Sequence, residues 1–183
     1  LQIIGKWSFA HSKIEEILIP SHVTQIQENA FESCKNLNKI EFPNGSELIS
    51  IDDFSFQMSS INEITIPSHV DQIKFNAFAF CEKLEKVEFS ENSELKYIGQ
   101  FAFRGATIKK IVLPSSLISI DDYCFHECRH IEEINFEPNS KLQSIGSFAF
   151  YESSLKFFTI PSSVIELKEN WCYVMTEAKV MPN

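Results

Sequence analysis

The residues most able to do chemistry lie around position 126, where cysteines and histidines gather. The segment Cys124-Phe125-His126-Glu127-Cys128-Arg129-His130 holds two cysteines four residues apart and two histidines four residues apart. Thiolates and imidazoles are the ligands that structural zinc sites use, provided that all four converge on one point. On a single helical turn this spacing resembles a zinc site. Whether the side chains converge depends on the elements that carry them.

Two pairs of aspartates, Asp52-Asp53 and Asp121-Asp122, form a second candidate, because positioned carboxylates can act as general acid and base. The sequence contains neither a glycine-rich phosphate loop nor a Ser/His/Asp order typical of nucleophilic catalysis. The five cysteines are a third feature that needs explaining.

The elements that position all of these residues follow from an internal repeat of 47 residues, which is the first thing to establish in such a chain. Its plainest landmark is an aliphatic-proline pair, found at Ile19-Pro20, Ile66-Pro67, Leu113-Pro114 and Ile160-Pro161. A phenylalanine recurs between these pairs, at Phe42, Phe89 and Phe136, so that the interval alternates between 23 and 24 residues. A double repeat of this kind predicts a solenoid of stacked coils, each of which buries the apolar face of its neighbour.

Each unit contains the pattern L-x-x-I-x-I/F, as in residues 37–42, whose alternation is typical of a short strand with one buried face. A proline or an Asn-Gly type turn follows. The pair V/L-x-x-I, as in Val23 and Ile26, then predicts a second short strand, and a small residue before phenylalanine, as in Ala30-Phe31, predicts a single helical turn.

These units resemble the BspA-type leucine-rich repeat, most clearly in residues 19–37 and 66–84, where I-P, A-F and C-x-x-L keep fixed offsets. The long unit at residues 139–150 is similar to the alternating form of surface proteins from parasitic protists. The resemblance implies an α/β fold, a leucine-rich-repeat solenoid that forms a right-handed β/α horseshoe. We expect about eight coils of alternating 23 and 24 residues with short parallel strands on the concave face.

We expect residues 1–183 to form a single domain that starts within a repeat, belongs to a longer protein and ends in a degenerate unit. Degeneracy shows where Trp171-Cys172 replaces Ala-Phe, where Ala178 replaces leucine and where Asn183 replaces phenylalanine. The formal charge of −9 argues against nucleic acid as a partner. No apolar run reaches the roughly 18 residues that a transmembrane helix needs.

The repeat also accounts for the reactive side chains. Cys34, Cys81 and Cys128 share one position two coils apart, so strand spacing predicts a separation of roughly 10 Å. Disulfides need Cα atoms within about 7 Å, so we predict small buried core residues instead. Cys124 and Cys172 also replace core residues. Unpaired cysteines favour a reducing compartment, which opposes a location on the cell surface.

Their positions in the repeat direct Cys124 and Cys128 into the core and place His126 and His130 on the surface. The two cysteines and the two histidines would therefore point in opposite directions. We therefore predict no metal site. The aspartate pairs fall in turns where sister units carry Gly99-Gln100 or similar residues, which favours solvated turns or local caps. We predict no cofactor and no enzymatic activity.

A binding surface remains the best-supported function, and departures from the repeat indicate where it lies. Outward strand positions on the expected concave face lose acidic residues towards the C-terminus and gain apolar ones, which makes Lys110, Val112, Phe157 and Thr159 candidate partner contacts. Phe75 and Phe80 stand at positions that are polar in most sister units, and they form a second candidate contact, for a partner or for self-association.

The family resemblance implies a cell-surface or secreted adhesion protein that binds extracellular-matrix or host-cell proteins. Two alternatives stay open. The unpaired cysteines favour an intracellular interaction scaffold, and an exposed aromatic such as Phe157 would suit a carbohydrate-binding surface. Asn44-Gly45-Ser46 is a glycosylation sequon in a turn, and a sugar there would favour the surface protein.

Overall fold

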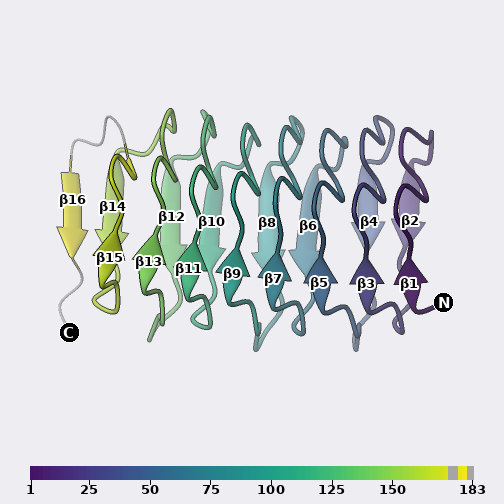
Figure 1. Ribbon diagram of the computed structural model, residues 1–183, viewed down its shortest axis with the longest axis horizontal. Coiled ribbons are helices and arrows are strands. Elements are labelled where there is room, and N and C mark those ends of the chain that lie inside the picture. Colours follow the sequence, from purple (N-terminus) through teal and green to yellow (C-terminus); the bar gives the residue numbers. More distant parts are fainter. Residues whose placement is uncertain (173–176, 181–183) are drawn as a thin grey trace.

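The chain folds into a parallel β-solenoid whose coils lie side by side in one row from the N-terminus to the C-terminal end (Figure 1). The computed structural model describes residues 1–172 and 177–180. Each coil contributes one odd-numbered and one even-numbered strand. In Figure 1 the odd-numbered strands lie in front and point up, whereas the even-numbered strands lie behind them and point down.

The odd-numbered strands pair in parallel as one eight-stranded sheet in the order of the chain. Each is two residues long, and its second residue aligns with the equivalent residue of the next coil, as Ile26 does with Ile51. The strands are β1 (Ile3–Ile4), β3 (Gln25–Ile26), β5 (Ser50–Ile51), β7 (Gln72–Ile73), β9 (Tyr97–Ile98), β11 (Ser119–Ile120), β13 (Ser144–Ile145) and β15 (Glu166–Leu167).

The even-numbered strands form the opposite face, which we call the even-strand face. From β4 to β14 they alternate buried apolar side chains with outward ones that are mostly polar, the exceptions being Val112 and Phe157. They arise from the L-x-x-I-x-I/F pattern and confirm its prediction of short strands. The strands are β2 (Glu16–Leu18), β4 (Lys39–Glu41), β6 (Glu63–Ile66), β8 (Lys86–Phe89), β10 (Lys110–Leu113), β12 (Glu133–Phe136), β14 (Phe157–Ile160) and β16 (Glu177–Val180).

The two sheets are joined by tight turns, and within residues 1–172 and 177–180 there is no helix. The helical layer of the expected β/α horseshoe, including the single helical turn, is therefore not found there. The reason lies in the backbone: in most coils two residues four positions apart adopt left-handed φ, such as Asn29 (59°) and Ser33 (54°). Left-handed residues interrupt a right-handed helix, and the amide of Phe31 bonds instead to the carbonyl of Ser55 in the next coil, at 2.7 Å.

A stack of phenylalanine rings runs through the core between the two sheets. Consecutive rings lie 5.1–5.5 Å apart between centroids and are parallel to within 16°. The spacing matches the rise from coil to coil, so every coil places one ring on the ring before it. The stack comprises Phe9, Phe31, Phe56, Phe78, Phe103, Phe125 and Phe150.

The ladder of the even-strand face is interrupted at every second junction, and a proline follows the second strand at each of these junctions, although Pro43 follows β4 at a junction that is paired. Pairing is full where a strand that ends in the aliphatic-proline pair precedes a strand that ends in the repeated phenylalanine. Thus β6 pairs with β8 over four residues, and the amide of Ser90 donates to the carbonyl of Ile66 at 3.0 Å. At the opposite kind of junction the donor position is occupied by Pro67, Pro114 or Pro161, which have no N–H. In the described residues β4 and β6 form no ladder, nor do β12 and β14, and β8 and β10 share a single pair.

Trp171 covers the C-terminal end of the phenylalanine stack in the described part of the chain. Its ring meets Phe150 edge-on at 6.2 Å and Phe158 at 5.4 Å. The indole is too large for the alanine position that it occupies in the repeat, so it lies over the stack rather than within it. The predicted degeneracy at Asn183 falls outside the described residues.

None of the described residues forms a helix with the length and apolar character that a membrane crossing needs.

Removing one ring from this stack should destabilise the whole domain. Phe78 is fully buried between Phe56 and Phe103. We expect Phe78→Ala to lower the free energy of unfolding by about 3–5 kcal/mol, measured by urea denaturation, because truncation of a buried phenylalanine leaves a cavity. Phe157→Ala is the control: its side chain is 64% exposed, and we expect a change within about 0.5 kcal/mol. Equal losses in both variants would contradict the stack as the source of stability.

Candidate binding surface

The outward side chains of the even-strand face form two rows, one residue per coil in each. The rows begin at Glu16 and Leu18 on β2 and end at Phe157 and Thr159 on β14. These positions are exposed as predicted, with Val112 at 53% and Phe157 at 64%. Two hollows open on this face, and each spans one of the junctions without a ladder.

The C-terminal hollow, which spans β12 and β14 and is bordered by Lys110 of β10, has a volume of about 430 Å³. It brings together three of the four predicted contacts on this face, Lys110, Phe157 and Thr159. Val112, the fourth, lies beside them on β10, in register with Asn135. Lys110 pairs with Glu133 at 2.7 Å, and this hydrogen bond lowers the pKa of the Glu133 carboxyl.

The N-terminal hollow is larger, with a volume of about 860 Å³, and spans the open junction between β4 and β6. Its floor holds Glu63 and Thr65 of β6 together with charged residues of β4 and β8. Its rim is made by the turns at 43–46 and 90–92, where the long units carry their inserted residues. None of the partner contacts predicted from the repeat lines this hollow.

Ion pairs on the even-strand face run mainly along the strands rather than across them. Lys39 bonds to Glu41 at 2.6 Å and Lys86 to Glu88 at 2.9 Å, in each case two residues further along the same strand. Side chains two apart in a strand share a face, which permits this contact. Each hydrogen bond raises the pKa of its lysine. Lys110 and Glu133 form an ion pair between neighbouring strands instead.

Phe75 and Phe80 lie on the turns between the sheets, and both are half-buried rather than exposed. The ring of Phe75 lies edge-on between Phe54 and Phe101, with centroids at 5.1 and 5.9 Å. The ring of Phe80 is covered by the guanidinium of Arg104, 5.0 Å from its centroid. Both side chains therefore make contacts within the chain that the repeat pattern did not reveal.

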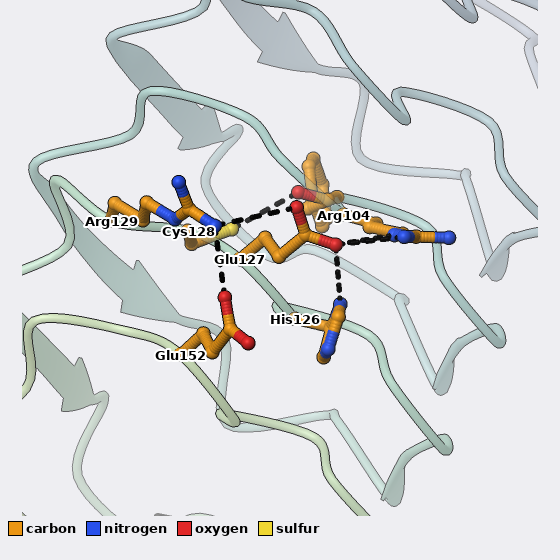
Figure 2. Close-up of polar contacts among 7 residues, drawn as sticks. Arg104, His126, Glu127, Cys128, Arg129 and Glu152 are labelled. Carbon is orange, nitrogen blue, oxygen red and sulfur yellow. Dashed lines mark hydrogen bonds and ion pairs between the residues drawn. The ribbon is translucent and has the colours of Figure 1, made fainter. Parts of the chain in front are cut away.

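Arg104 also belongs to a network of charges on these turns (Figure 2). Its guanidinium donates to the Glu127 carboxylate through Nη2 at 2.7 Å and Nε at 3.2 Å, which lowers the pKa of Glu127. Arg129 links Glu127 to Glu152, with its Nη2 2.9 Å from Glu152 Oε2. The charges are matched inside the network, so it joins neighbouring coils rather than presenting free charge.

The zinc-like segment is divided between core and surface, though not quite as predicted. Cys124 and Cys128 are fully buried, as expected, and the Cys128 thiol donates to the carbonyl of Phe103 at 3.0 Å. His130 is exposed. His126 is not on the open surface: its ring stacks on Tyr151 at 5.5 Å, and burial lowers its pKa. No group of three or more His, Cys, Asp or Glu in residues 1–172 is arranged to hold a metal ion.

The aspartate pairs act as caps between coils, which confirms the structural interpretation of these turns. Asp53 accepts a hydrogen bond from the amide of Phe75 at 3.0 Å, and Asp122 accepts one from the amide of Ser147 at 2.8 Å. A carboxylate engaged in this way satisfies a backbone donor of the adjoining coil.

Comparison with known proteins supports this architecture. The model of the BspA-type leucine-rich repeat region matches six copies over residues 2–94 and 49–176. The chain belongs to this family. A leucine-rich repeat protein from Bacteroides ovatus is 34% identical, with a TM-score of 0.68 over 90% of this chain. The leucine-rich repeat protein of Treponema pallidum has a TM-score of 0.70 at 20% identity over 92% of this chain and 74% of its own, which shows the fold alone.

A leucine-rich cell surface protein from Faecalibacterium prausnitzii has a TM-score of 0.55 at 19% identity over 91% of this chain, which again shows the fold alone. The chain spans 48% of the Bacteroides ovatus protein and 60% of the Faecalibacterium prausnitzii protein. None of the curated proteins searched matches the chain. BspA-type leucine-rich repeats serve in general as protein-interaction modules.

The thiols of this BspA-type domain couple its stability to alkaline pH. Burial raises the pKa of Cys81 from 9.0 to about 12. Because the folded value exceeds the unfolded one, this contribution is complete below pH 9.0 and is lost as the pH rises towards about 12. We expect Cys81→Ala to make the alkaline loss of unfolding free energy shallower by up to about 1.4 kcal/mol per pH unit. Leu84→Ala, which removes a buried neighbour without a proton, should leave the slope unchanged; a changed slope there would contradict the assignment.

Proposed function

We propose that the chain is the protein-interaction module of a cell-surface adhesion or recognition protein that binds extracellular-matrix or host-cell proteins through its even-strand face. The observation that carries this proposal is the C-terminal hollow, where Phe157 stands exposed near the ion pair of Lys110 and Glu133, with Val112 exposed beside the hollow on β10. Exposed aromatic side chains next to a hollow are typical of contact residues. In the horseshoe that the family resemblance implies, this face is the concave one.

The location at the cell surface is supported by the family and by a relative described as a cell surface protein. The competing function, an intracellular interaction scaffold, is favoured by the buried thiols of Cys34, Cys81, Cys124 and Cys128, which form no disulfide. Surface biotinylation of the intact parent protein separates the two. Asn44 is exposed in its turn, so mass spectrometry for a glycan at this residue gives a second, independent test.

The face itself is tested by exchange of its apolar residues. We expect Val112→Ser with Phe157→Ser to weaken binding to immobilised matrix proteins about tenfold or more, because exposed aromatic anchors dominate such interfaces. Surface plasmon resonance measures the change. Tyr97→Ser is the matched control, since this aromatic is 48% exposed on the opposite face. Equal weakening by both would exclude the even-strand face, and capture by a glycan array in place of proteins would favour the carbohydrate alternative.

Phe75 and Phe80 are proposed as a second contact, for a partner or another copy of the chain, because two aromatics in polar positions of one coil are the strongest departure from the repeat. We expect Phe75→Ser with Phe80→Ser to lower the average mass of the chain in analytical ultracentrifugation at concentrations where the wild type associates. A wild type that stays monomeric, together with unchanged partner binding by the variant, would rule this contact out.

A further inference from the structure

The N-terminal hollow of the even-strand face differs from the C-terminal hollow in charge. Four carboxylates and two ammonium groups line the N-terminal hollow: Glu41, Glu63, Glu88, Glu91, Lys39 and Lys86. The C-terminal hollow is balanced, with Lys110 and Lys156 against Glu132 and Glu133. The N-terminal hollow therefore carries an excess of two negative charges that the other hollow lacks.

The excess falls on two particular carboxylates. Both lysines of the N-terminal hollow are held by the glutamate two residues further along the same strand, at 2.6 Å for Lys39 and 2.9 Å for Lys86. Within residues 1–172, the carboxylates of Glu63 and Glu91 have no hydrogen bond or ion pair at contact distance, although the charge of Glu63 acts at longer range on Lys39 and Lys86. Glu63 lies on the central strand of the floor, in register with Lys86 on β8.

We propose that the N-terminal hollow binds an extended, arginine- or lysine-bearing segment of a protein partner, with Glu63 as the central recognition residue. The hollow lies along exposed strands, with Glu63 on its floor and Glu91 in a turn at its rim, so one extended segment can bring separate cationic side chains to the two carboxylates. An extended segment directs alternate side chains to one face, which suits contacts of this kind. A guanidinium matches a carboxylate with two parallel hydrogen bonds.

The place of this site follows from the double repeat. Pro67 removes the donor that would close the ladder between β4 and β6, and the inserted turn residues 43–46 raise the rim beside that junction. Thr65 replaces a glutamate of the neighbouring strands at the centre of the floor, leaving a small side chain there between Glu41 and Glu88. The larger hollow and the excess of negative charge therefore lie at the same junction of the solenoid, between β4 and β6.

The inference rests on the proposed function only in using the even-strand face, so it is tested with a synthetic probe. The probe is a labelled glycine-serine peptide with arginine at alternate positions, and its control carries citrulline, which is uncharged, in place of arginine. Fluorescence anisotropy with the full chain should show binding of the arginine peptide and not of the citrulline peptide. We expect Glu63→Gln to weaken binding about tenfold, since the bond to a charged acceptor is lost.

Matched variants separate this site from the acidity of the whole chain. Glu82→Gln removes the same charge from an exposed glutamate on the turns, and it should leave the affinity within about twofold, because distant exposed charges are screened by salt. Equal weakening by both variants would overturn the proposal, as would the absence of binding or equally tight binding of spermine, which carries charge without a peptide. Val112→Ser with Phe157→Ser should not change peptide affinity, so a failure in matrix binding leaves this test unaffected.

Discussion

The stacking of one phenylalanine ring per coil is the contact on which the rest of the structure depends. Rings 5.1–5.5 Å apart and nearly parallel require consecutive coils to arrive in the same orientation and at the same rise. The backbone meets this requirement by a left-handed residue on each side of the small-Phe pair, which turns the chain so that the amide of each stacked ring bonds to an adjoining coil. The flat rings and the hydrogen bonds thus fix the same spacing, and the two sheets follow from it.

This constraint explains why reactive side chains in the chain serve the architecture. The thiols of Cys34, Cys81 and Cys128 each donate to the carbonyl of a stacked phenylalanine in the preceding coil, at 3.0 Å. A thiol at this position is small enough for the core and adds a second hydrogen bond to a carbonyl that already accepts one from a backbone amide. Asp53 and Asp122 accept hydrogen bonds from amides on the turns. Residues that resemble ligands or catalysts in the sequence therefore complete hydrogen bonds between coils.

The period of 47 residues was enough to predict the strands, the buried rings, the buried cysteines and the exposure of Val112 and Phe157. Each of these features depends only on whether a repeated position faces the core or the solvent. The period did not predict the environments of Phe75, Phe80 and His126, which depend on neighbours from adjacent coils such as Arg104 and Tyr151. Nor did it predict ion pairs within strands, since side-chain rotamers decide between Glu41 and a neighbouring strand as the partner of Lys39. The single helical turn was expected but not found, because the spacing of residue types in a sequence does not show whether a residue adopts a positive or a negative φ.

The double repeat also determines where this fold can hold a partner. A single repeat would give every junction of the even-strand face the same ladder, and the surface would be an even sheet. Alternation places Pro67, Pro114 and Pro161 at the donor positions of alternate junctions, and the two hollows described above each span one of these junctions. Because the core ring and its hydrogen bonds are the same in both kinds of unit, these openings arise without loss of the stack. The outward residues at each opening are then free to differ: carboxylates outnumber lysines in the N-terminal hollow, whereas the charges of the C-terminal hollow are balanced and an exposed phenylalanine stands among them.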